Sequence, residues 1–401
     1  MPAWDLSQMR MTLALCASLT ASTIAVSVAA QTGALSSVSH YWPKALDAQG
    51  APPTHWSEAE KSLSPDACRQ CHAEQFTQWQ TSRHAHALSS GVLGQLLTFD
   101  AADTAQCLGC HAPLDEQRTA FEAARTQALA HRRDRLGLAA AGNTCAGCHL
   151  RANRRFGPPQ RNTGAVEQSA TQAVHDGVTR VKFFESPEFC ARCHQFTADR
   201  AINGKPLENT LVEWQASPQA AQGATCQTCH MPDRHHLWRG IHDPDMVRAG
   251  LTIATSVDAQ AAHFEIVNSG VGHAFPTYMT PKVVMHAVVL DAKGQPQAQT
   301  ARQHVIGRRV RYDKETDRWS ELSDTRLLPQ QSVALELPWA GRDRVRVWLE
   351  VAPDDYYATV VFPDLLRDLP ASGEARQLIV KAAGDAAVSN YVLFEVELHR
   401  P

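Results

Sequence analysis

Ten of the eleven cysteines occur in five repeats of the pattern Cys-x-x-Cys-His. The cysteine pairs are Cys68/Cys71, Cys107/Cys110, Cys145/Cys148, Cys190/Cys193 and Cys226/Cys229, followed by His72, His111, His149, His194 and His230. Two sulfurs three residues apart lie on one helical turn, where both can reach one edge of a porphyrin, and the next imidazole can point at its iron. This spacing is the attachment signature of c-type haem. The sequence therefore predicts five haem c groups, with the motif histidines as proximal iron ligands.

Zinc sites and redox-active dithiols also use Cys-x-x-Cys pairs. A structural zinc site takes four ligands from two half-sites, so five pairs would leave one unmatched. Zinc also does not require a histidine directly after every second cysteine. A thioredoxin-like dithiol needs a βαβ context, which this sequence lacks. Haem attachment is the interpretation that uses every cysteine except Cys16.

A six-coordinate haem iron needs a second axial ligand, and the composition favours histidine for it. The chain has 19 histidines, far more than the five motifs use, whereas after the N-terminal segment it has only Met231, Met246, Met279 and Met285. Axial ligand identity tunes the haem potential, and a missing ligand leaves room for a substrate. We therefore expect mostly bis-histidine, low-spin haems of comparatively low potential.

The segments around the first and fourth motifs carry further recognisable residues. Gln75, Trp79, Ser82, His84 and Ala85 follow the first motif, and Phe189 and Gln195-Phe196 flank the fourth. Residues 66–280 resemble the multihaem cytochrome superfamily that includes the tetrahaem electron carrier of nitrifying bacteria and hydroxylamine oxidoreductase. The resemblance implies distal ligands at His84, with His86 as the alternative, and at His175.

Two later segments extend the resemblance. Residues 236–242 read His-Leu-Trp-Arg-Gly-Ile-His and are similar to an H-x-aromatic-x-G-x-H element whose two histidines ligate different haems. Residues 272–277 read Gly-His-Ala-Phe-Pro-Thr and resemble a G-H-x-x-P-T element whose histidine reaches back to a haem. The resemblance thus implies distal ligands at His236, His242 and His273, with His235 as a competitor of His236. Which distal histidine serves which haem stays open at this point.

The sequence departs from relatives that have enzymatic signatures. It contains no C-x-x-C-K motif, and it has five attachment motifs where hydroxylamine oxidoreductase has eight haems. We expect an electron-transfer cytochrome with redox-protein donors and acceptors. The alternative is an oxidoreductase acting on a small nitrogen or sulfur compound at one five-coordinate haem, and whether the protein is an enzyme stays open. A non-redox adhesion role for the C-terminal segment is a third and weaker reading.

The elements that position these residues fall into four segments. Residues 1–30 consist of a short, weakly basic start and an apolar run from residue 11 that ends in small residues, which predicts a secretory signal peptide or, alternatively, an N-terminal anchor. Residues 31–64 form a lead-in. Residues 65–249 hold all five motifs and leave so little chain per haem that the macrocycles must form much of the core. Residues 250–401 contain no cysteine and form the fourth segment.

The expected fold class is α+β, with a helical and loop-rich haem domain followed by an all-β, sandwich-like domain. One long helix is predicted over 114–141. Alternating apolar residues predict strands at 262–268, 283–291, 332–337, 345–351, 357–362, 377–382 and 390–398.

Charge and the N-terminal segment set expectations about location and partners. With a net charge of −3, the chain shows no basic excess for nucleic-acid binding. A signal peptide predicts a periplasmic or extracellular protein, and association with a membrane or outer-membrane complex stays open.

Overall fold

The computed structural model describes residues 37–43, 45–125, 137–161, 174–313, 315–316, 318–339 and 344–401. The predicted signal peptide or anchor at 1–30 lies outside these residues. The chain divides into two compact units, Met1–Pro43 and Lys44–Pro401. The first contains the short helix α2 (Val38–Tyr41), which Ser37 caps. All attachment motifs lie in the second unit.

Short helices joined by loops make up the motif-bearing part. They are α3 (Glu58–Lys61), α4 (Pro65–Arg69), α5 (Ala73–Gln80), α6 (Ser90–Leu96), α7 (Ala101–His111), α8 (Asp115–Arg125), α9 (Cys145–His149), α11 (Pro187–His194), α12 (Thr210–Gln215), α13 (Pro218–Ala221), α14 (Cys226–His230) and α15 (Pro244–Gly250). A small sheet combines β1 (Leu150–Arg151), β2 (Arg154–Gly157) and β3 (Val178–Arg180). Side-chain caps define many helix starts, since Thr144 and Thr225 accept hydrogen bonds from the first turns of α9 and α14.

The predicted single helix over 114–141 is wrong. Helix α8 ends at Arg125, residues 126–136 lie outside the described part, and Gly137–Ala140 form a separate 3₁₀ turn. Gly137 has φ +48°, a left-handed conformation that a right-handed helix does not continue through. Composition favoured a helix here, but the left-handed Gly137 prevents one continuous helix from reaching residue 141.

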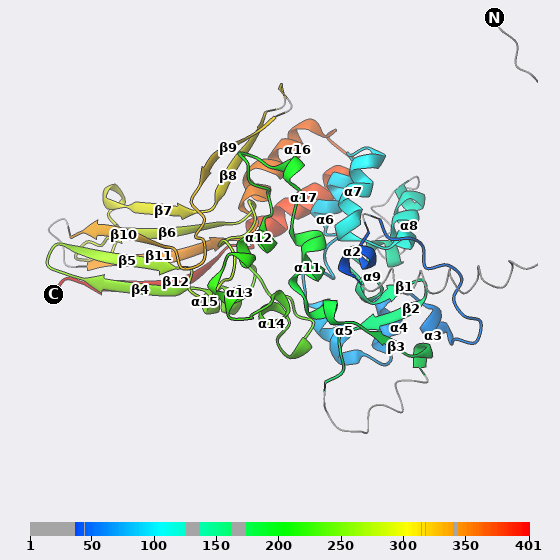
Figure 1. Cartoon of the computed structure of the whole chain (residues 1–401). Helices are drawn as coiled ribbons and strands as arrows, with labels where there is room; N and C mark the ends of the chain where they lie inside the picture. The colour runs from blue at the N-terminus through cyan, green and yellow to red at the C-terminus, as the bar shows by residue number, and fades with distance from the viewer. Residues whose placement is uncertain are drawn as a thin grey trace, which may run out of the picture. The chain divides into compact units, whose positions relative to one another are not determined.

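Two antiparallel sheets form a sandwich in the C-terminal part (Figure 1). One sheet has the order β10-β5-β4, from Ser332–Pro338, Ala261–Val267 and Thr252–Val257. The other has the order β12-β11-β6-β7, from Tyr391–His399, Arg344–Ala352, Lys282–Val289 and Arg302–Ile306. A separate hairpin pairs β8 (Arg308–Asp313) with β9 (Arg318–Asp324).

The alternating residues of both sheets face one shared core. Phe264 and Ile266 of β5 and Met285 and Leu349 of β6 and β11 are all fully buried in a single apolar cluster. The ring of Phe264 stacks on that of Phe394 in β12, with centroids 5.8 Å apart. Period-2 patterning therefore found five of the seven sandwich strands, β5, β6, β10, β11 and β12, but it missed β4 and β7.

The expectation of an all-β segment at 250–401 is wrong for residues 357–387. The predicted strand at 357–362 is a π-helical turn (Tyr357–Val361) leading into α16 (Phe362–Asp368), and the predicted strand at 377–382 lies inside α17 (Glu374–Ala387). Residues of α17 such as Ile379, Ala382 and Ala386 recur at helical spacing and are buried. Apolar residues a few positions apart fit either period over so short a window. The chain as a whole remains α+β.

Helix α17 packs on α6 of the motif-bearing part, beside α16 (Figure 1). Two glycines allow the close approach. A Cβ on Gly94 would lie 2.7 Å from Ile379 Cδ1, and one on Gly91 would lie 2.8 Å from Phe362 Cζ. The C-terminal segment thus leaves the sandwich, covers a helix of the motif-bearing part, and returns as strand β12.

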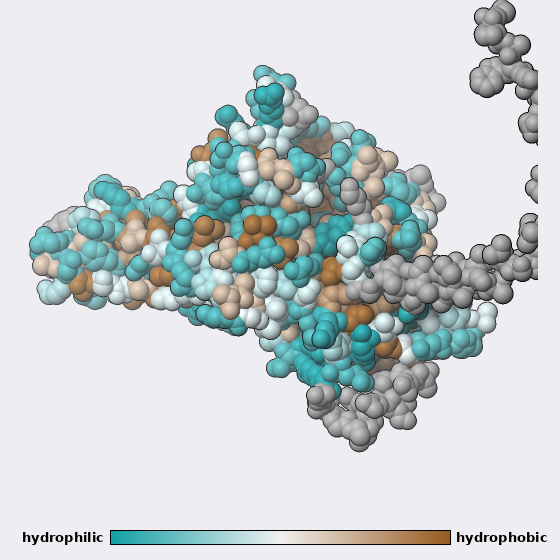
Figure 2. All heavy atoms as spheres, in the orientation of Figure 1, coloured by the Kyte–Doolittle hydropathy of each residue, from teal (hydrophilic) through white to brown (hydrophobic). Residues whose placement is uncertain are grey.

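Hydrophilic residues cover most of the sandwich face that Figure 2 shows, with hydrophobic ones dispersed among them. Within the ranges given above, no helix has the length and hydropathy needed to cross a bilayer.

Candidate haem-binding site

All five attachment motifs lie on single helical turns. The second to fifth motifs end α7, occupy α9, end α11 and occupy α14. In the first motif, α4 ends at Arg69, but the amides of Cys71 and His72 still donate to Cys68 O at 3.2 and 2.9 Å. Each pair of sulfurs and its histidine therefore has the one-turn arrangement that thioether attachment to a porphyrin requires.

The motif cysteines differ in how far the protein covers them. Eight are half-buried, whereas Cys71 and Cys229 are exposed. Cys229 lies on α14, a one-turn helix with no buried residue, beside the polar Thr228, whose Oγ1 is 4.0 Å from its sulfur. So short a helix cannot bury all of its side chains. An accessible thiol can still react, so haem attachment at Cys71 and Cys229 stays a prediction.

Four motif histidines have their Nδ1 atoms fixed by hydrogen bonds. His111 donates to Ala87 O at 2.6 Å, His149 to Phe156 O at 2.8 Å and His230 to Arg239 O at 2.8 Å. His194 instead donates to a carboxylate, Glu208 Oε1, at 2.9 Å. Carbonyl and carboxylate oxygens only accept, so each Nδ1 carries a proton and Nε2 is the nitrogen left for a metal. Burial lowers the pKa of His194, but the Glu208 carboxylate outweighs it and raises that pKa to about 9, so this ring would release its Nε2 proton on binding a metal.

Three of these imidazoles each face a second histidine. The ring centres are 6.2 Å apart for His194 and His84, 6.3 Å for His149 and His236, and 6.4 Å for His230 and His273. Two imidazoles on opposite sides of one metal ion, each bound at about 2.0 Å, have ring centres about 6.3 Å apart. The three pairs thus have the spacing of trans axial ligands.

Burial keeps these opposing histidines neutral. Loss of solvent lowers the pKa of His84 to about 3, and those of His236 and His273 to about 4, with further lowering by neighbouring histidines. Neutral imidazole is the form that binds a metal. The three side chains are therefore ready to ligate at neutral pH without releasing a proton.

The other two expected distal ligands have different surroundings. His175 lies within electrostatic range of His72, and its Nδ1 is 3.6 Å from Glu60 Oε1. Its φ is +59°, a conformation rare outside glycine that marks a constrained loop. His242 pairs through Nε2 with Asp354 Oδ2 at 3.1 Å. Over the described part of the chain, neither ring contacts a motif histidine.

Cysteines of different motifs meet in pairs. The thiols of Cys68 and Cys145, of Cys110 and Cys193, and of Cys190 and Cys226 lie close enough to shift each other's pKa. These contacts link the first motif to the third, and the fourth motif to both the second and the fifth. Each sulfur belongs to one attachment site, so these pairs of attachment sites are neighbours in the fold.

One tryptophan lies between two of the histidine pairs. The Trp238 ring contacts His84 at 4.7 Å and His236 at 5.2 Å between centroids, edge-on in both cases. Its φ of +41° is unusual for so bulky a residue. Its amide donates to His230 O at 3.1 Å, and the next residue, Arg239, accepts from His230 Nδ1. Residues 236–239 therefore contact the motif histidines His149 and His230, and also His84.

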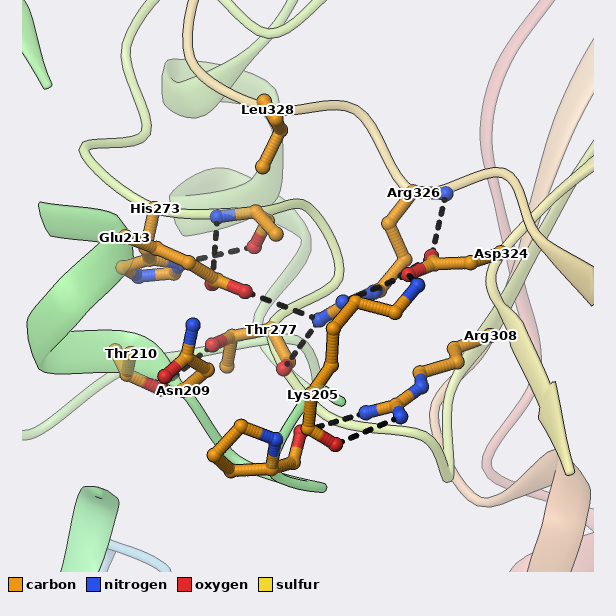
Figure 3. Close-up of polar contacts among 12 residues, drawn as sticks. Lys205, Asn209, Thr210, Glu213, His273, Thr277, Arg308, Asp324, Arg326 and Leu328 are labelled. Atoms are coloured by element: carbon orange, nitrogen blue, oxygen red, sulfur yellow. Dashed lines mark hydrogen bonds and ion pairs between the residues drawn. The ribbon is translucent and has the colours of Figure 1, made fainter. Parts of the chain in front are cut away.

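A buried charge network holds the loop of His273 (Figure 3). Glu213 Oε2 of α12 accepts the amide of Ala274 at 3.0 Å, and Glu213 Oε1 lies 3.4 Å from Arg326 Nη1. Arg326 donates to both carboxylate oxygens of Asp324, at 2.9 and 3.0 Å, and to Thr277 O at 3.1 Å. The network thereby ties the loop of an expected haem ligand to β9.

Further charges complete this network. Lys205 lies 2.6 Å from Asp324 and 3.0 Å from Glu321, and Arg308 donates to Glu321 at 2.8 Å. Three cations therefore balance three anions. Such balance allows charges to stay ionised with little solvent.

The surroundings of His111 differ from those of the paired histidines. Across the residues that the structure describes, no second imidazole lies opposite its ring. Two half-buried phenols, Tyr278 and Tyr357, lie within electrostatic range of Cys107 of the same motif. Burial raises the pKa of Tyr278, and raises that of Tyr357 to about 12. Both phenols are thus protonated donors at neutral pH.

Sequence reasoning missed several residues around the motifs. Trp238 lies inside the quoted 236–242 segment, so its place between two histidines could have been suspected. Glu208, Glu213 and Arg326 belong to no pattern, and only the fold brings them to His194 and His273.

The donor chemistry of these residues fits haem c. In the described ranges, no three His, Cys, Asp or Glu side chains are grouped to hold a metal ion directly. Each histidine pair offers two donors, and a porphyrin supplies the other four that an octahedral iron needs. A haem c group would therefore be held by both sets of residues, with the histidine pairs on its iron and the neighbouring cysteines on its porphyrin.

Comparisons with known proteins agree with this chemistry. The family described as "Cytochrome c554 and c-prime" matches residues 67–132, which include the first two motifs and His84. A penta-heme cytochrome c552 from Thermochromatium tepidum has a similar fold, with TM-score 0.56 and 20% identity over 86% of this chain and 100% of that one. No curated protein matches. The motifs, the family match and the similar fold together agree with a chain that binds several haem c groups.

Proposed function

We propose that this chain carries five haem c groups and transfers electrons through them, with bis-histidine coordination at the third, fourth and fifth motifs. The axial pairs would be His149 with His236, His194 with His84, and His230 with His273. The single observation that carries this proposal is the 6.2–6.4 Å spacing of the three ring pairs, which equals that of trans ligands on one iron. For the first motif we propose His175 opposite His72.

The haem irons supply one-electron chemistry by alternating between Fe(III) and Fe(II). The protein's own residues do the rest. The cysteines hold each macrocycle, and the hydrogen bonds at Nδ1 orient the proximal rings. The opposing histidines would hold each iron together with the motif histidines, which would leave no place for a substrate. An arrangement of this kind carries electrons and does not catalyse.

The cysteine contacts support a branched order of electron transfer. The contacts between motifs run from the first to the third and from the fourth to the second and fifth. Trp238 joins the distal histidines of the third and fourth sites, and Cys148 lies within electrostatic range of Cys190 and Cys193. The fourth site would therefore be the junction of the assembly.

We also propose that the protein works in the periplasm or at the cell surface and exchanges electrons with redox-protein partners. Support for this location comes from the apolar N-terminal sequence. Expressing the chain with a reporter enzyme fused at the C-terminus, and assaying it in periplasmic and cytoplasmic fractions, tests the proposal. A cytoplasmic reporter would contradict it.

Mass spectrometry and EPR test the haem count and the coordination. The purified chain should carry a mass increment of five haems, and at least three low-spin ferric signals. Replacing His84 by Gly should convert one low-spin signal to high-spin. The matched control is His263→Gly, because His263 pairs with Asp258 on the sandwich and should leave every signal unchanged. Fewer than five haems, or no spin change in His84→Gly, would contradict the proposal.

A second candidate function rests on His111. No imidazole opposes it in the described part of the chain, and two protonated phenols, Tyr278 and Tyr357, lie near its motif. An open coordination position with nearby proton donors is what reduction of a small nitrogen or sulfur oxyanion requires. This would make the second site an oxidoreductase centre that the other haems supply with electrons.

Ligand binding distinguishes this alternative from a pure carrier. A high-spin ferric signal that nitrite or hydroxylamine converts to low-spin would favour the oxidoreductase. The change should persist in His84→Gly and be altered in Tyr278→Phe. A wild-type protein with five low-spin haems that binds neither compound would exclude it.

A further inference from the structure

The fourth motif differs from the others in what its histidine donates to. His111, His149 and His230 each donate Nδ1–H to a neutral backbone carbonyl. His194 donates to the carboxylate of Glu208 at 2.9 Å. Of the four fixed motif histidines, it alone has an anionic partner.

The fold holds Glu208 firmly in this position. Its carbonyl accepts the amide of Phe196 at 2.8 Å, and the adjoining Asn209 forms a β-bridge with Gln195. Its side chain is only 14% exposed. Among the described residues, His194 is its one ion-pair partner within 4.0 Å, so no arginine or lysine neutralises the carboxylate.

A carboxylate at Nδ1 changes the imidazole as a ligand. Hydrogen bonds to an ionised acceptor are about twice as strong as neutral ones. Pulling the Nδ1 proton toward an anion makes Nε2 a stronger donor to its metal. A stronger donor and a nearby negative charge both favour Fe(III) over Fe(II), so both effects lower the reduction potential.

We propose that Glu208 is a positioning residue that lowers the potential of the haem at Cys190 and Cys193 below those at the second, third and fifth motifs. This inference rests on the proposed function, in which His194 and His84 are axial ligands. The haem at Cys190 and Cys193 would adjoin the sites of three other motifs. Glu208 would therefore set the reduction potential of the haem through which the other sites exchange electrons. Electrons passing between the other haems would then cross a haem of lower reduction potential, and the Glu208 carboxylate would determine how much lower it is.

The test is Glu208→Gln in the complete haem-loaded protein. Glutamine keeps an acceptor oxygen for Nδ1–H but removes the charge, which makes His194 resemble the other three histidines. The affected haem is identified as the one whose low-spin EPR signal disappears in His84→Gly. In an EPR-monitored redox titration its potential should rise by about 59 mV or more, a tenfold change in a one-electron equilibrium, while the other haems shift less.

The matched control is Glu188→Gln. Glu188 begins the same helix, α11, and carries the same charge, but it makes no hydrogen bond to His194. A Glu208→Gln shift no larger than that of Glu188→Gln would overturn the inference, and so would an equal shift of all haems. If Glu208→Gln fails to mature, Glu208→Asp should give a smaller rise, because the shorter side chain weakens the hydrogen bond; an unchanged potential there would also overturn it.

These outcomes are separable from failure of the proposed function. The axial pairing fails if His84→Gly leaves every signal low-spin. The Glu208 inference fails when His84→Gly behaves as expected but the potential of that haem does not depend on residue 208.

Discussion

Replacing Arg326 by Met should destabilise the protein strongly, and more so at high pH. Arg326 is 4% exposed and Glu213 is 7% exposed, so the substitution leaves the Glu213 carboxylate buried without its cation. Asp324 keeps Lys205 as a partner at 2.6 Å. Removing one member of a buried pair costs about 3–5 kcal/mol. Loss of the Arg326 bond to Thr277 O adds to this on the loop that carries His273.

The pH dependence follows from the carboxyl group of Glu213. Burial already raises its pKa, and Arg326 opposes that rise. Without Arg326 the native-state pKa rises further above the unfolded value of about 4.3. A raised native pKa means that the protonated form stabilises the fold at low pH, and that this stability is lost as pH rises through the raised pKa. Each unit of pKa change corresponds to about 1.4 kcal/mol, so the loss should be larger near about pH 8 than near about pH 5.

Guanidinium unfolding of the haem-loaded protein, followed by circular dichroism at both pH values, measures these effects. Arg346→Met is the matched control, because Arg346 pairs with Glu395 and Glu397 on the solvent side of β11 and is 33% exposed. It should cost about 0–1 kcal/mol. The double variant Glu213→Gln/Arg326→Met should recover much of the stability at about pH 8, since no buried charge is then left alone.

Three outcomes would refute this reasoning. They are a loss for Arg326→Met no greater than for Arg346→Met, a loss that does not change with pH, and a double variant whose loss is the sum of the single losses.

Three further predictions concern packing and the histidine pairs. Gly384→Ala should stabilise the protein by about 1 kcal/mol through helix propensity, since a Cβ there has open space. Gly94→Ala, whose Cβ would lie 2.7 Å from Ile379 Cδ1, should instead destabilise it by about 1–3 kcal/mol. Thermal unfolding measures both, and equal effects would mean that α6 and α17 are not packed together. Phe264→Ala should cost about 3–5 kcal/mol in denaturant unfolding, because it empties the core between the sheets; a loss below 1 kcal/mol, on the order of a surface change, would contradict the sandwich. Trp238→Ala should shift the EPR g values of two low-spin haems together, since its ring contacts both His84 and His236; a shift of one alone would show that the tryptophan does not position both rings.

The residues themselves determined the cofactor chemistry. Five Cys-x-x-Cys-His motifs predict haem attachment because the spacing is local: one helical turn contains both sulfurs and the ligand. Sandwich strands such as 345–351 were also predictable. Every second side chain of such a strand faces the core, so apolar and polar residues alternate along a stretch as short as the strand itself. The residues at 377–382 misled, because Leu378, Val380 and Ala382 alternate as in a strand. In the structure Ile379, Ala382 and Ala386 are buried at helical spacing, and packing against α6 decides for a helix.

Tertiary structure alone decided which side chains meet. Nothing local relates His84 to His194, or His273 to His230, since long stretches of chain separate the partners and only the fold brings their rings to 6.2 and 6.4 Å. The same holds for Glu208, an ordinary carboxylate in the sequence that the fold places on one imidazole. Attachment depends on neighbours along the chain and is readable from it. Coordination and potential depend on neighbours in space, so the sequence alone could not assign them.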